Sequence, residues 1–87
     1  MGESERLSSA GNVLVPSILA LRRLGFAVSR SDTPDGEEWR AERGGLVLIA
    51  NDPVSLMGLH ALREERGSKW PADDAEIDRV LNEFYPE

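Results

Sequence analysis

His60 is the single histidine of the chain, and an imidazole has an ordinary pKa near neutral pH. Glu64 follows four residues later, so the two side chains share one face if this segment is helical. A carboxylate beside an imidazole can fix its tautomer for general-base catalysis or help to hold a metal ion. The sequence has no second histidine and no cysteine, so zinc would need carboxylates as its other ligands. We favour a structural pair at the edge of an apolar helix face, with a hydrolytic or small-molecule-binding site as the alternative.

Carboxylates are concentrated near the C-terminal end of the sequence. They would serve as an acid–base pair only in a cleft that raises the pKa of one of them. On a short exposed helix they instead complement the positive end of the helix dipole, and a docking face for a basic partner is the functional interpretation. The residues concerned are Asp73, Asp74, Glu76, Asp78 and Glu83.

Four arginines and two aromatic residues are further candidates for binding. The arginines would form an anion site if the first two helices lay side by side, although two of them suit a helix C-terminus. Trp70 precedes Pro71 and is expected either to pack over the start of the last helix or, with Tyr85, to be an exposed hot spot for a partner. The arginines are Arg22, Arg23, Arg63 and Arg66.

Three helices are needed to position these groups. Asn12 and Gly25 are expected to begin and end a helix over residues 13–24. Asp52 followed by a proline predicts a second helix that ends at Gly67, with an apolar arc wide enough to contact both a sheet and another helix. Asp73 and Glu76 resemble a capping box for the last helix. Its apolar residues form one narrow stripe: Ile77, Val80, Leu81 and Phe84.

The segment between the first two helices predicts a three-stranded antiparallel meander. Phe26 opens an alternating strand that ends in a turn over residues 32–36, where proline, aspartate and glycine suit the turn positions. Trp39 and Ala41 share one face of the second strand, expected over residues 37–42. Residues 43–45 supply the second reversal. The apolar run over residues 46–50 is expected to be the best-buried strand.

Length and charge bound the remaining possibilities. The 87 residues fit one domain, with a flexible tail at residues 1–11 and a single α+β domain at residues 12–87. Ten basic residues against sixteen acidic ones give a net charge of −6, and residues 51–87 carry nine acidic groups against four basic ones. An acidic chain repels phosphates, which argues against nucleic acid as a partner. The apolar run at residues 13–21 is too short to span a membrane and has the wrong flanks for a signal peptide, so we expect a cytoplasmic location.

These observations predict an α+β fold in the order α-β-β-β-α-α, with three helices on one face of a three-stranded antiparallel meander. We expect a small, acidic, non-catalytic protein–protein interaction domain with an inhibitor, immunity-like or adaptor role. Its partner would be a protein, basic in the charge-complementary case, and a homodimer of structural role is the alternative. No cofactor is expected. Residues 52–81 resemble a signature of small bacterial proteins to which no activity attaches. The predicted binding surface consists of Trp70, Asp74, Asp78, Glu83 and Tyr85.

Overall fold

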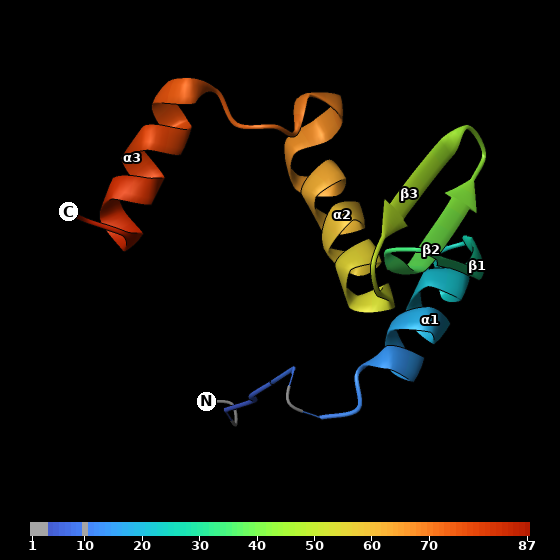
Figure 1. Ribbon diagram of the computed structural model, residues 1–87. Helices are drawn as coiled ribbons and strands as arrows, with labels where there is room; N and C mark the ends of the chain where they lie inside the picture. The colour runs from blue at the N-terminus through green and yellow to red at the C-terminus, as the bar shows by residue number, and fades with distance from the viewer. Residues whose placement is uncertain (1–3, 10) are drawn as a thin grey trace.

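A computed structural model describes residues 4–9 and 11–87, and it confirms the α+β class and the element order (Figure 1). Two α-helices flank the sheet along the chain, and a third follows a short 3-10 helix. The elements are α1 (Leu14–Arg23), β1 (Ala27–Thr33), β2 (Gly36–Arg43), β3 (Leu46–Ala50), α2 (Pro53–Arg66), η1 (Gly67–Lys69) and α3 (Asp74–Phe84). Of the predicted tail, residues 4–9 and Gly11 are described and contain no helix or strand. Residues 1–3 and 10 lie outside the described residues.

The ends of α2 follow from local chemistry, as expected. The carboxylate of Asp52 accepts a hydrogen bond from the backbone N–H of Ser55 at 2.7 Å, and Pro53 occupies the first helical position. Gly67 ends the helix with a φ of 77°, a conformation that favours glycine. The bounds predicted for this helix are therefore confirmed.

The start of α1 differs from the prediction, because Val13 rather than Asn12 precedes the first helical residue. Val13 has a helical backbone conformation, and no side chain caps the helix. Pro16 has no N–H, so one of the donors that a capping side chain would satisfy is absent. The hydroxyl of Ser17 donates to the carbonyl oxygen of Val13 at 2.7 Å, and Gly25 ends the helix region with a φ of 95°.

The three strands form an antiparallel sheet in the order β1-β2-β3. Thr33 pairs with Gly36 and Arg43 pairs with Leu46, so each hairpin closes through two residues. Ala41 is buried and Trp39 packs against the core from the same face of β2, as its alternation predicted. The meander is confirmed.

Strand β3 has the largest share of buried and half-buried residues of the three strands, as its apolar sequence predicted, but one of its faces is open. Leu48 is buried, but Val47 and Ile49 are 43% and 48% exposed. Because β3 lies at one edge of the sheet and helices cover only one face, alternate side chains remain outside. The apolar run therefore predicted correctly that β3 is the best-buried strand, but it did not indicate that one face is open.

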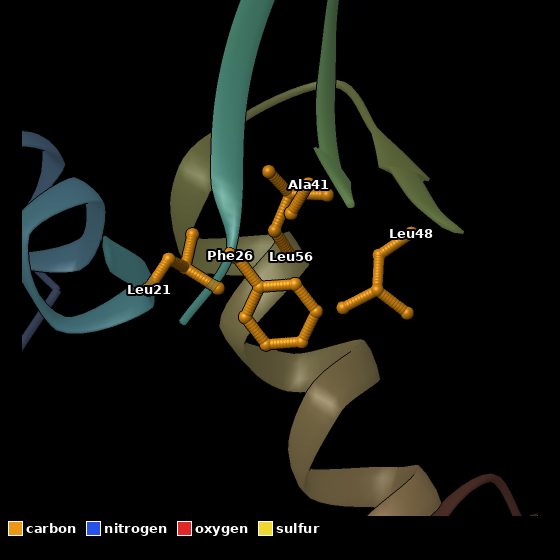
Figure 2. Packing of buried hydrophobic residues seen from close by; sticks show 5 residues of the cluster. All are labelled: Leu21, Phe26, Ala41, Leu48 and Leu56. Carbon is orange, nitrogen blue, oxygen red and sulfur yellow. The ribbon is translucent and has the colours of Figure 1, made fainter. Parts of the chain in front are cut away.

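The core lies between α1, α2 and the covered face of the sheet. Figure 2 shows its five buried side chains turned toward one another, and they come from both helices, from β2 and β3, and from the residue before β1. The guanidinium of Arg43 closes one side of this cluster: it lies 4.5 Å from the ring centre of Phe26 and donates to the carbonyl oxygen of Leu24 at 2.8 Å. The residues of the cluster are Leu21, Phe26, Ala41, Leu48 and Leu56.

Helix α3 takes no part in this core. Both α1 and α2 contact the strands, whereas α3 lies away from the sheet beyond the end of α2 (Figure 1). The expectation that all three helices would cover the sheet is thus met by two of them. The apolar stripe of the third helix is left exposed.

Candidate protein-interaction surface

The first turn of α3 is fixed by a reciprocal pair of hydrogen bonds. The carboxylate of Asp73 accepts from the backbone N–H of Glu76 at 2.8 Å, and the carboxylate of Glu76 accepts from the backbone N–H of Asp73 at 3.0 Å. This is the capping box predicted from the sequence, with aspartate in place of serine or threonine. It allows α3 to begin as a helix without help from the core.

Arg66, the last residue of α2, joins the two helices. Its Nε donates to the carbonyl oxygen of Trp70 at 2.7 Å, and one of its terminal nitrogens, Nη2, lies 3.4 Å from the Glu76 carboxylate. One side chain therefore contacts the end of α2, the connecting segment and the capping box of α3. These are exposed contacts of modest strength, and they span the connection between α2 and α3.

The stripe on α3 is apolar and open. Within the described residues nothing covers it, and its members are 41%, 45%, 50% and 68% exposed in the order Ile77, Val80, Leu81 and Phe84. Carboxylates border it on both sides at helical spacing: Asp74 and Asp78 on one side, Glu76 and Glu83 on the other. A shallow hollow of about 460 Å³ lies along it, lined by Arg66, Ala72, Glu76, Ile77, Arg79, Val80 and Leu81.

A second apolar feature lies on the body, between the free edge of β3 and the C-terminal half of α2. We call it the β3–α2 groove, and its volume is about 270 Å³. Trp70, 44% exposed, lines one end of it. Arg63 is the charged residue of its lining, and a neighbouring depression brings Arg43 next to Arg63. The full lining is Leu46, Val47, Leu48, Ile49, Leu59, Arg63, Ser68 and Trp70.

The structure distributes the five predicted binding residues over two places. Trp70 lies in the β3–α2 groove, while the acidic residues and Tyr85 are exposed on or just after α3. Trp70 lines the groove beside β3 and α2 and is partly exposed there, in line with the second of the two expectations for this residue. Sequence reasoning missed the groove itself and the role of Arg66. The acidic residues are Asp74, Asp78 and Glu83.

The arginines do not gather into the anion site considered above. Helices α1 and α2 are in contact, but Arg66 is directed to Trp70 and Glu76, and Arg63 lines the groove. Arg22 and Arg23 are exposed in the last turn of α1, where they complement the helix dipole.

The ring of His60 packs against the core, one helical turn before Glu64. Its ring meets the ring of Phe26 edge to face, with 5.5 Å between centroids and 82° between planes. The Nδ1 atom is buried and has no hydrogen-bond partner among the described residues. No hydrogen bond or ion pair joins His60 to Glu64 in that part of the chain. The imidazole therefore acts here as a packing group.

The strongest electrostatic cluster lies at the outer end of the β1–β2 hairpin. Arg30 donates to Asp32 at 2.8 Å and to Glu37 at 3.0 Å, and the indole N–H of Trp39 donates to Glu37 at 2.9 Å. The hydrogen bond from Arg30, then that from Trp39, lowers the pKa of Glu37 below its ordinary value. The hydrogen bond to Glu37 and the nearby charge of Asp32 raise the pKa of Arg30. The cluster ties the two strands together.

Among residues 4–9 and 11–87, no three His, Cys, Asp or Glu side chains are grouped as a metal site requires. None of the helices described has the length and apolarity needed to cross a bilayer. No family model, curated protein or solved structure matches this chain.

Proposed function

We propose that the chain is a non-catalytic protein–protein interaction domain that contacts its partner through α3. One observation carries the proposal: a capped helix presents an apolar stripe with four large side chains, and the body of the protein leaves that stripe uncovered. An amphipathic helix laid into an apolar groove is a common mode of recognition between proteins, with anchors at this spacing.

The charges on α3 define the kind of groove that would accept it. Carboxylates border the stripe on both sides, so a partner groove with arginine or lysine along its rim would be complementary, whereas an acidic rim would be repelled. Arg79, the one basic residue of α3, lines the hollow beside Glu76, so the four carboxylates outnumber it along the helix but it lies at the contact with them. The inhibitor, immunity-like and adaptor roles all fit such a surface, and this proposal does not choose among them.

Site-specific photo-crosslinking in the cells that express the protein tests the proposal. A photoreactive residue at Leu81, within the stripe, should give an adduct with a defined protein, identified by mass spectrometry. The same residue at Asn82, on the far side of α3, is the matched control and should not. The adduct from Leu81 should also disappear when Phe84 is changed to serine. Equal adducts from both positions, or none from Leu81, would contradict the proposal.

A further inference from the structure

We infer that the partner of α3 is a second copy of this chain, and that α3 of each copy docks into the β3–α2 groove of the other. This inference rests on the proposed function, because it uses the same stripe and adds the identity of the partner. It requires that the chain itself carry a surface of the right shape, polarity and charge.

The β3–α2 groove supplies the shape and the polarity. Most of its lining is aliphatic and comes from four residues of β3, Leu46–Ile49, and from Leu59 of α2. Its volume of about 270 Å³ is sufficient for one large side chain. Phe84, the most exposed member of the stripe, is the natural anchor, with Trp70 at one end of the groove to meet its ring.

Charge complementarity distinguishes this occupant from the others. The rim of the groove carries Arg63, with Arg43 in the adjoining depression, and the stripe is bordered by carboxylates. Two α3 helices packed stripe to stripe would instead bring acidic borders together, which is repulsive. The helix and the groove of this chain are thus complementary to each other, but the helix is not complementary to itself.

The contacts of Arg66 explain why the groove is filled by the other copy rather than by the same chain. They span the connection between α2 and α3, and folding α3 back would break the bonds to Trp70 and Glu76. A reciprocal exchange keeps these bonds and gives two identical contacts related by a twofold axis, a closed arrangement. Doubling a small contact brings the interface toward the area that specific dimers need.

Sedimentation equilibrium of the purified full chain tests this inference. We expect a monomer–dimer equilibrium between micromolar and millimolar concentration. Changing both Leu81 and Phe84 to serine should weaken dimerisation by roughly 30-fold or more. Val47→Glu, which places a carboxylate at the groove, should weaken it by about 10-fold or more. The matched controls are Asn82→Ser on the far side of α3 and Ser29→Glu on the other edge strand, and each should leave the equilibrium unchanged.

Mixing the Val47→Glu variant with the Leu81→Ser, Phe84→Ser variant tests whether the helix of one copy contacts the groove of the other. In a mixed dimer, the intact helix of the Val47→Glu chain meets the intact groove of the Leu81→Ser, Phe84→Ser chain, so one contact of two is restored. The mixture should therefore associate more strongly than either variant alone. A mixture that behaves as the sum of its parts, or a dimer insensitive to Val47→Glu, overturns docking into the groove. These positions are exposed, and a thermal unfolding curve for each variant verifies that it is folded.

Two monomeric outcomes separate this inference from the proposed function. A chain that stays monomeric at all concentrations, with rapidly exchanging α3 amides, overturns the second copy as partner but leaves α3 free for another protein. A monomer whose α3 amides are protected from exchange has the stripe packed within its own chain, and that result overturns both.

Discussion

Truncating a leucine in the body and one in α3 should affect stability very differently. Leu56 is fully buried among α1, α2 and the sheet, and Leu81 is half exposed on α3. A buried leucine replaced by alanine lowers the free energy of unfolding by about 2–5 kcal/mol. Because the core cluster has five residues and the hydrophobic side chains packed against it are only partly buried, the surroundings can relax, and we expect about 2–3 kcal/mol for Leu56→Ala. Leu81→Ala should change the free energy of unfolding by no more than about 0.5 kcal/mol.

The assay is thermal unfolding followed by circular dichroism at the lowest protein concentration that gives a signal, where dimers are least populated. A domain of this size should have about 4–13 kcal/mol of stability, so the loss at Leu56 is a large fraction of it. The expected fall in Tm is about 10–20 °C for Leu56→Ala and roughly 3 °C or less for Leu81→Ala. A loss at Leu81 equal to that at Leu56 would refute the conclusion that α3 lies outside the core.

Three further changes test separate parts of the structure. Glu37 has a lowered pKa in the folded protein. Its stabilising effect is therefore present above the ordinary glutamate pKa of about 4.3 and is lost as the pH falls through the lower pKa of the folded state. Glu37→Gln should flatten the dependence of Tm on pH in that acidic range. His60→Leu removes a buried Nδ1 atom that lacks a hydrogen-bond partner among the described residues, so the free energy of unfolding should stay the same or rise by about 1 kcal/mol. A loss above about 2 kcal/mol in urea unfolding would show that the imidazole makes a stabilising contact. Reversing the charge of three carboxylates on α3 should slow the association of the chain with its protein partner by about 10-fold at low salt in stopped-flow measurements, with little effect at high salt. An equal effect at both salt concentrations would exclude electrostatic attraction. The carboxylates reversed are those of Asp74, Asp78 and Glu83.

Local signals in the sequence were sufficient for most of the elements. Asp52 and Gly67 set the ends of α2 through a side-chain cap and a positive φ, and both effects depend on a few adjacent residues. The two hairpins and the capping box of α3 are local in the same sense. These features were predicted correctly because little beyond the neighbouring chain decides them.

The features that fix the candidate site are not local, and the sequence did not predict them. A stripe such as that of α3 indicates a helix with one apolar face, but it does not say what covers that face. Trp70 contacts the groove because of where η1 and the following segment run, and Arg66 acts through a carbonyl and a carboxylate beyond its own helix. The exposure of Val47 follows from the helices covering only one face of the sheet, which the apolar run of β3 did not reveal.

Hydrogen exchange of the α3 amides at increasing protein concentration tests most directly whether this helix is an intermolecular docking element. Amides of α2 report on the body of the protein and serve as the internal reference. In dilute solution we expect α3 to exchange far faster than α2, because an isolated short helix is only marginally stable in water. As concentration rises, α3 should become protected while α2 changes little. Protection of α3 equal to that of α2 at the lowest concentration would contradict the proposal.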